Sequence, residues 1–177
     1  IWMPNCDSTT IGRMLEIADM EPERCLPMIG LHPCYVNEGF ESELHIIEEW
    51  LAKRKFIAIG EIGMDLYWDK TYIREQEYAF EEQLKWAIQL NLPVAIHTRD
   101  AFPEVINCIR NAGSESLTGV FHSFTGNEAE LASLLEFKNF KIGINGVITF
   151  KTSTLQKVLK NTPIDTIILE TDAPYLA

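Results

Sequence analysis

Five side chains that can bind a metal ion or move a proton follow short apolar runs in this sequence. They are His32, Glu61, His97, His122 and Asp172. Carboxylate oxygens and imidazole nitrogens together are donors that divalent transition metals accept in proteins. A single histidine in this position is more often a hydrogen-bonded structural residue, but here the pattern recurs along the chain. It predicts a metal site whose ligands are brought together by the fold, because the histidines are far apart in sequence.

The clearest of these runs leads into Glu61. Residues 56–59 are apolar without alternation, which is typical of a strand buried on both faces of a parallel sheet. Gly60 and Gly63 flank the carboxylate and allow the backbone to turn and to approach another segment closely. We therefore expect Glu61 at the end of a buried strand, and a salt bridge with a nearby lysine is the simpler alternative.

Strands and helices are expected to alternate along the whole chain. Apolar runs predict seven strands, at residues 1–4, 26–31, 56–59, 93–96, 119–121, 140–144 and 166–171. Helical spacing predicts a first helix capped by Ser8 or Thr9, and further helices over residues 41–54, 73–90, 102–109, 127–135 and 155–159. Asn127 with Glu130 resembles a capping box at the start of the helix over residues 127–135.

This alternation is typical of an α/β protein with a parallel sheet. We expect a TIM (β/α)₈ barrel, seen here without its first strand and its final helix. A doubly wound open sheet is the alternative, and it is disfavoured because no G-x-G-x-x-G motif follows the first visible strand. In a barrel, all five candidate side chains would converge at the carboxyl ends of the strands, where barrel enzymes place their sites.

The composition limits the functions that this chain can have. Its 177 residues are 46% hydrophobic, enough for one domain with a proper core, and no apolar stretch approaches the ~20 residues of a membrane span. The four cysteines lack C-x-x-C spacing, so we expect reduced thiols in a cytoplasmic protein, or in a nuclear one if the source is eukaryotic. The formal net charge of -11 argues against broad electrostatic binding of nucleic acid, unless bound metal supplies local positive charge.

Five motifs in this sequence resemble those of the TatD family of metal-dependent deoxyribonucleases, within the amidohydrolase-like barrels. They occur in the order of the family and span nearly the whole chain. They begin at Gly30, Gly60, Ile96, Phe121 and Glu170, and they read Gly-Leu-His-Pro, Gly-Glu-Ile-Gly-Met-Asp, Ile-His-Thr-Arg-Asp, Phe-His-Ser-Phe-Thr-Gly and Glu-Thr-Asp-Ala-Pro-Tyr-Leu. The last motif is specific by itself.

The resemblance implies a set of metal ligands and a reaction. Glu61, His97, His122 and Asp172 would bind divalent ions, two per site in the full-length protein, with Glu61 as the bridge between them. Glu61 and Asp172 are the expected catalytic residues, and Asp172 would also accept the proton of the attacking water. The ions would be magnesium, manganese, zinc or nickel, and the reaction would be the hydrolysis of phosphodiester bonds of DNA or RNA by an exonuclease.

Two further residues are expected to contact the substrate. His32, which precedes a proline, would face the substrate rather than bind metal. Arg99 could brace a phosphate through two hydrogen bonds, and a salt bridge with Asp100 or Glu104 is equally open. Tyr67 and Trp68 could stack on a base, although packing in the core or at the rim is the simpler expectation.

The sequence departs from the family in one respect. Most members of the family carry a His-x-His or similar pair at the end of the first strand, and that strand is not in this sequence. We expect residues 1–177 to form a single metal-dependent hydrolase barrel domain, truncated at both ends, which aggregates or fails to fold cooperatively when expressed alone.

Two other functions remain as alternatives. One is a metal-dependent amidohydrolase or lactonase acting on a small molecule, which would share this ligand set. The other is an inactive truncated barrel. For the preferred function the partner is nucleic acid as substrate, with no membrane and no obligate protein partner.

Overall fold

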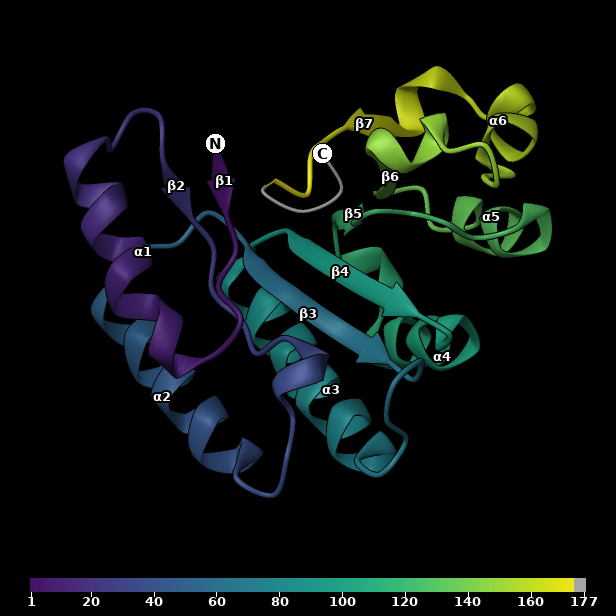
Figure 1. Cartoon of the computed structure of the whole chain (residues 1–177). Coiled ribbons are helices and arrows are strands. Elements are labelled where there is room, and N and C mark those ends of the chain that lie inside the picture. Colours follow the sequence, from purple (N-terminus) through teal and green to yellow (C-terminus); the bar gives the residue numbers. More distant parts are fainter. Residues whose placement is uncertain (174–177) are drawn as a thin grey trace.

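Within the described part of the chain, seven parallel strands lie in the order in which they occur in the sequence (Figure 1). The computed structural model describes residues 1–173. The strands are β1 (Trp2–Met3), β2 (Leu26–Pro27), β3 (Ile59–Asp65), β4 (Val94–Arg99), β5 (Gly119–Phe121), β6 (Phe140–Ile144) and β7 (Ile167–Leu169). β1 pairs with β2, and β3 to β7 form a five-stranded sheet. An isolated parallel bridge between Ile29 and Ile59 joins the two sheets.

This strand order is that of a barrel, and it excludes the doubly wound alternative. A doubly wound sheet reverses its strand order at a switch point, whereas here each strand neighbours the next one in the chain. Among the described residues, β1 and β7 are the two outer strands, so the ring of strands is open between them.

Helices connect the strands and lie around the outside of the sheet (Figure 1). The α-helices are α1 (Ser8–Met20), α2 (Phe40–Lys53), α3 (Ile73–Leu90), α4 (Phe102–Ala112), α5 (Glu128–Leu135) and α6 (Leu155–Val158). Short 3₁₀ turns occupy Pro33–Tyr35, Ser114–Ser116, Gly146–Thr149, Leu159–Asn161 and Ile164–Thr166.

The helix ends follow the capping rules. Asn127 accepts hydrogen bonds from the N–H groups of Ala129 and Glu130, and Glu130 reaches back to the N–H of Asn127. Asn91 ends α3 in the left-handed conformation, as its place before a proline predicts. The first helix is capped by Asp7, not by Ser8 or Thr9, because a carboxylate accepts the free N–H groups of the first turn equally well.

Apolar side chains from strands and helices form one main core. Its largest fully buried members include Phe80, Phe121, Phe140, Ile59 and Ile96. All four cysteines are free. Within residues 1–173, no helix combines the length and the apolar composition that crossing a membrane would need.

Strand β2 is shorter than predicted. The strand expected over residues 26–31 pairs as a strand only at Leu26–Pro27. Beyond it, the N–H of Leu31 donates to Oε1 of Gln83 at 2.6 Å, and Nε2 of Gln83 donates to the carbonyl of Leu31 at 3.2 Å. A buried side chain therefore replaces the neighbouring strand as the partner of this backbone.

Glu61 and His97 stand inside strands, which corrects their expected place after strand ends. β3 stays paired with β4 through Asp65, and the register is irregular between Ile59 and Ile62. Sequence reasoning ended each strand at its last apolar residue, but the ladder continues through polar residues because both strands remain hydrogen-bonded.

Gly63 makes this continuation possible. Its φ is +136°, and a Cβ atom placed on it would lie 2.0 Å from the carbonyl oxygen of His97. The close backbone approach expected at this glycine is therefore confirmed, and its partner is His97.

The last strand is also shorter than predicted. The sequence predicts a strand over residues 166–171, whereas β7 spans Ile167–Leu169 after a 3₁₀ turn. The N–H of Glu170 donates to the carbonyl of Ile144 at 3.1 Å and extends the pairing by one residue. Asp172 stands three residues beyond β7, and residues 174–176 of the last sequence motif lie outside the described residues.

Candidate functional site

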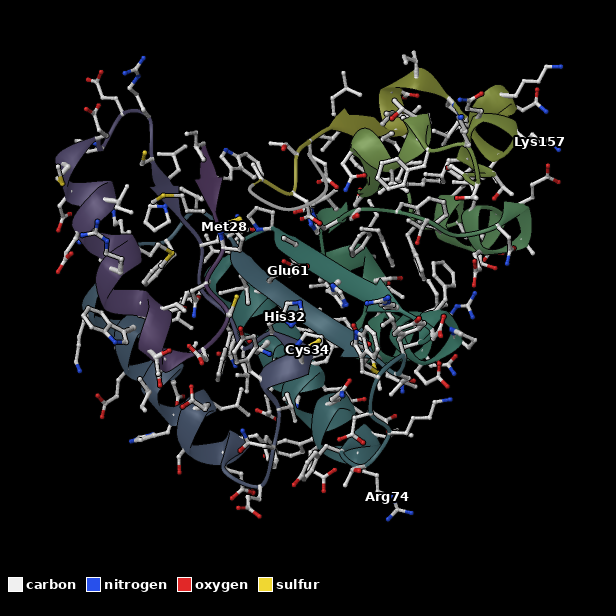
Figure 2. The ribbon with its side chains drawn as sticks, viewed as in Figure 1. Met28, His32, Cys34, Glu61, Arg74 and Lys157 are labelled. Atoms are coloured by element: carbon white, nitrogen blue, oxygen red, sulfur yellow. The ribbon has the colours of Figure 1, made fainter. Side chains whose placement is uncertain are left out.

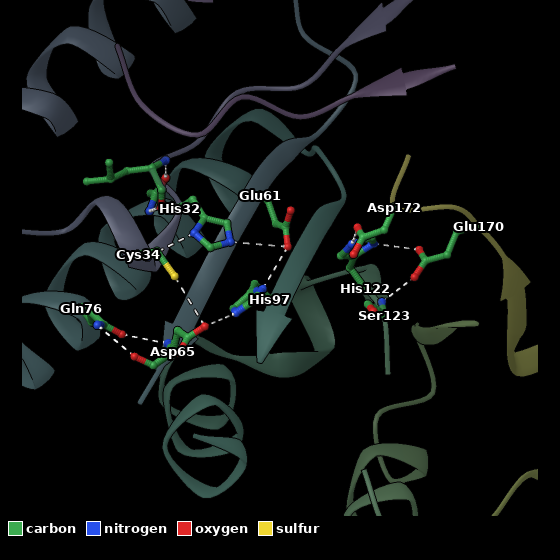
Figure 3. A network of polar contacts seen from close by, with 12 residues as sticks. His32, Cys34, Glu61, Asp65, Gln76, His97, His122, Ser123, Glu170 and Asp172 are labelled. Atoms are coloured by element: carbon green, nitrogen blue, oxygen red, sulfur yellow. Dashed lines mark hydrogen bonds and ion pairs between the residues drawn. The ribbon is translucent and has the colours of Figure 1, made fainter. Parts of the chain in front are cut away.

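Two groups of polar side chains lie close to the carboxyl ends of the strands (Figure 3). Of the six predicted site residues, the structure brings together three in the first group and two in the second, and Arg99 belongs to neither group. The first group contains His32, Glu61 and His97, together with Cys34 and Asp65. The second group contains His122 and Asp172, together with Ser123 and Glu170.

His97 is the centre of the first group. Its Nε2 lies 2.8 Å from Oδ2 of Asp65, and its Nδ1 lies 3.2 Å from Oε1 of Glu61. The same Glu61 oxygen lies 3.8 Å from Nε2 of His32. One donor atom from each of His32, Glu61 and His97 can be chosen so that all three lie within 4.8 Å of one another, which is close enough to share a metal ion.

His32 differs from His97 in the way its ring is held. The backbone N–H of Cys34 donates to Nδ1 of His32 at 3.1 Å. Burial lowers the pKa of His32 to about 4, although Glu61 opposes this, so the ring is neutral at neutral pH. Because Nδ1 accepts a hydrogen bond, the single ring proton is on Nε2, and this N–H points toward Glu61. His32 thus presents a hydrogen-bond donor to the site.

His122 is the centre of the second group and follows directly after β5. Its Nδ1 lies 3.0 Å from Oε2 of Glu170, and its Nε2 lies 2.8 Å from Oδ1 of Asp172. Glu170 also accepts the backbone N–H of Ser123, which fixes the carboxylate beside the ring. Each of the two histidines, His97 and His122, is therefore held between two carboxylates.

The carboxylates determine the charge of both imidazoles. Burial lowers the pKa of His97, but its hydrogen bonds with Asp65 and Glu61 outweigh burial and raise that pKa to about 9. The pKa of His122 is also raised to about 9, since Glu170, Glu61 and Asp172 outweigh burial. The pKa values of Glu61 and Asp65, the two carboxylates beside His97, shift in the opposite direction.

Burial would raise the pKa of Glu61, but the hydrogen bond from His97 and the charges of the three histidines keep it below its usual value. The electrostatic contribution of His122 to this shift links the two groups. Burial would also raise the pKa of Asp65, but His97 and the backbone N–H of Tyr67 lower it to about 2. Both carboxylates are therefore ionised.

Within residues 1–173, His32, Glu61 and His97 bring donor atoms close enough to hold a divalent ion, whereas the second group does not form a three-residue set of this kind by itself. Each group combines carboxylate oxygens with imidazole nitrogens, the mixed donor set of zinc, manganese and nickel sites. In each group a protonated imidazole now balances the negative charge, and a cation can take over that role once the proton leaves. The side chains of Glu61, His97 and His122 are 15%, 22% and 18% exposed, so the donors are shielded but open to an ion.

Sequence reasoning missed two of the carboxylates. Asp65 and Glu170 belong to the motifs noted above, but neither was given a role. A strand predicted to run through Asp65 would have placed this carboxylate beside His97, because β3 and β4 are paired there. Glu170 gave no comparable signal, since only the position of the β6–β7 pair brings it to His122.

Arg99 lies at the exposed end of β4, two residues after His97. Its guanidinium Cζ is 3.7 Å from the ring centre of Tyr67. Within residues 1–173, no carboxylate lies at ion-pair distance from Arg99, so the salt-bridge alternative is not formed. Tyr67 and Trp68 are 49% and 76% exposed, which rules out the expectation that they pack in the core.

Comparison with known proteins gives relatives along the whole chain. A Bacillus subtilis (strain 168) protein named uncharacterized metal-dependent hydrolase YabD is 37% identical over 96% of this chain and 66% of its own length. The 3'-5' ssDNA/RNA exonuclease TatD of Pantoea ananatis is 31% identical over 91% of this chain and 62% of its own length. This chain therefore spans slightly less than two thirds of each of these two relatives.

A solved structure and a family model agree with these relatives. The crystal structure of YjjV, a TatD homologue from Escherichia coli K12, matches 99% of this chain and 68% of that chain with a TM-score of 0.91 and 30% identity. The sequence model described as TatD related DNase matches residues 1–177. The strand order of a barrel, the paired histidines and carboxylates, and this match over the full chain lead to one conclusion: the chain belongs to the family of TatD related DNases.

Proposed function

We propose that this chain carries the metal-binding part of a hydrolase that cleaves phosphodiester bonds of nucleic acid as an exonuclease. The observation that carries the proposal is the arrangement of His97 and His122, each held between two carboxylates and linked electrostatically through Glu61. The family description and the name of the Pantoea ananatis relative support nucleic acid as the substrate. The name of the Bacillus subtilis relative supports metal dependence.

Four side chains would hold the metal, two ions per site in the full-length protein. They are Glu61, His97, His122 and Asp172. His97 would bind through Nδ1, because Asp65 engages its Nε2, and His122 would bind through Nε2, because Glu170 engages its Nδ1. The donor set suits zinc, manganese or nickel, while magnesium would rely on the carboxylates.

Bound divalent ions supply positive charge beside the phosphoryl oxygens and lower the pKa of a water molecule. The chain itself supplies the proton acceptor. Oδ1 of Asp172 lies 2.8 Å from Nε2 of His122, the nitrogen proposed to bind metal. Its side chain is 31% exposed, so it can reach a water molecule beside this nitrogen and take its proton. Glu61 is more deeply buried, and it would serve as a metal ligand and as the second catalytic carboxylate. The Nε2–H of His32 would donate to a phosphate oxygen.

The test uses the full-length protein that contains this chain. Replacement of His97 and His122 together by alanine should abolish stoichiometric binding of a divalent transition ion, measured by elemental analysis. It should also abolish the shortening of a single-stranded oligonucleotide labelled at one end. His45→Ala is the matched control, because His45 lies exposed on α2 and, within residues 1–173, pairs with no acidic side chain other than Glu49, at 3.5 Å.

Two results would overturn the proposal. Unchanged metal content in the double variant would remove the proposed ligands. Hydrolysis of a small amide or lactone by a protein that cuts neither DNA nor RNA would replace the nuclease by an amidohydrolase or lactonase.

A further inference from the structure

An arginine and two aromatic residues form an exposed cluster beside the first group of the site. The Arg99 Cζ lies 3.7 Å from the ring centre of Tyr67 and 5.4 Å from that of Trp68. The two aromatic rings meet edge to face, with their centres 4.6 Å apart. We call Tyr67, Trp68 and Arg99 the arginine–aromatic cluster.

The backbone fixes this cluster relative to the candidate metal ligands. Asp65 at the end of β3 pairs with Arg99 at the end of β4, and the N–H of Leu66 donates to the Arg99 carbonyl at 2.9 Å. Oδ1 of Asp65 accepts the N–H of Tyr67 at 3.0 Å, while its Oδ2 contacts His97. One carboxylate thus orients both the imidazole of the site and the first residue of the cluster.

The charge of Arg99 is available to a ligand. The chain has a formal net charge of -11, yet no carboxylate in the described part of the chain lies at ion-pair distance from Arg99. The nearby acidic residue Asp69 is engaged by the N–H and the hydroxyl of Thr71 at 2.8 and 2.7 Å. A polyanion approaching the site would therefore meet an uncompensated guanidinium in a mostly acidic protein.

Contacts within the cluster do not bury the side chain of Trp68. Arg99 lies over the ring of Tyr67, but Trp68 remains 76% exposed. A guanidinium held over an aromatic ring keeps its N–H edges free, and these edges match the oxygens of a phosphate. The exposed indole offers a flat face on which any base can stack.

We propose that the arginine–aromatic cluster binds one nucleotide of a single-stranded nucleic acid next to the metal site. The base stacks on Trp68, and Arg99, held in place by Tyr67, donates hydrogen bonds to the adjoining phosphate. This inference rests on the proposed function and adds to it which part of the substrate the protein binds outside the metal site. Stacking does not depend on the hydrogen-bonding edge that distinguishes one base from another. The site therefore accepts any base but requires an unpaired one.

The test measures binding apart from cleavage. The full-length protein without divalent ions is titrated into a fluorescein-labelled single-stranded oligonucleotide, and anisotropy gives the Kd. Trp68→Ala should raise the Kd by about tenfold, the effect of one lost stacking contact. Arg99→Gln should raise the Kd by a similar factor. It should also reduce the slope of log K against log salt concentration by about one, as expected for the loss of one phosphate contact.

Matched variants separate the cluster from general effects. Arg74→Gln removes the same charge from an exposed residue at the start of α3, where Figure 2 shows its side chain projecting away from His32 and Glu61, and it should leave the salt dependence unchanged. Trp2→Ala removes another exposed tryptophan and should leave the Kd unchanged. An oligonucleotide in which every base is missing should bind wild type and Trp68→Ala equally.

The outcomes distinguish this inference from the function on which it rests. If the wild type cleaves the oligonucleotide but wild type, Trp68→Ala and Arg99→Gln have equal Kd values, the proposed role of the cluster is wrong and the proposed nuclease function stands. A wild type that neither binds nor cuts the oligonucleotide would overturn both. Self-association that Trp68→Ala abolishes, seen by sedimentation with no change in oligonucleotide Kd, would assign the surface to a protein contact and refute the proposal.

Discussion

Oδ2 of Asp65 lies 2.8 Å from Nε2 of His97, and this contact decides which nitrogen of the imidazole faces Glu61. A carboxylate that accepts the N–H of a metal-binding histidine fixes the orientation of the ring and makes its other nitrogen a better donor. Asp65 would therefore act on the proposed metal through His97, without contacting the ion itself.

The first prediction follows from this contact. Asp65→Asn keeps the size and the acceptor for the Tyr67 N–H but removes the negative charge, so metal affinity should fall about 10- to 100-fold. The affinity is measured by competition with a chromogenic chelator. Asp69→Asn is the control, because Asp69 is exposed and bonds only within its own loop. Equal affinities of the wild type and Asp65→Asn would show that Asp65 does not support the ligand.

The second prediction concerns Asp172. Asparagine retains one oxygen to face His122 but is a poor base, so Asp172→Asn should lower turnover of an oligonucleotide by about 100-fold or more, the scale of a lost general base. The thermal unfolding midpoint should change little, because this side chain is not part of the apolar core. Asp165→Asn, which makes the same charge change at an exposed position before β7, should retain full turnover. Full activity of Asp172→Asn would show that another group accepts the proton of the attacking water.

The third prediction concerns Gln83, which is 1% exposed. Gln83→Leu would leave the N–H and the carbonyl of Leu31 buried without partners, at a cost of about 1–3 kcal/mol for each group. The free energy of unfolding, measured by urea titration of the full-length protein, should fall by about 3 kcal/mol. Gln89→Leu on the exposed face of the same helix should change it by less than about 0.5 kcal/mol. Similar values for the two variants would mean that water molecules replace Gln83 as hydrogen-bond partners of the Leu31 backbone.

The fourth prediction compares two glycines. Gly63→Ala places a methyl group 2.0 Å from the carbonyl oxygen of His97 and forces alanine into a positive φ, so the variant should fail to fold or should bind no metal. Gly12→Ala in α1 meets no atom within 4 Å and should stabilise the protein by about 0.5–1 kcal/mol. Thermal unfolding with metal analysis checks both, and a stable, metal-binding Gly63→Ala variant would contradict the close approach of β3 and β4.

Local signals in the sequence were sufficient for most of the fold. The helix over residues 73–90 and the capping box at Asn127 depend on neighbouring residues alone, so both were predicted correctly. Strand ends were not, because polar residues such as Glu61 and His97 stay in a strand for as long as the neighbouring strand remains bonded to them. The candidate residues were found by type, but their grouping depends on distances that no local pattern contains.

Two buried glutamines on α3 tie together parts of the site that are far apart in the sequence. Gln76 bonds both backbone polar groups of Asp65, and Gln83, about two helical turns later, does the same for Leu31, which precedes His32. The amide hydrogens of Leu31 and Asp65 should therefore exchange with solvent at one common rate, set by the detachment of α3 from the sheet. As long as α3 stays in place, its two glutamines hold the backbones of Leu31 and Asp65 at a fixed separation.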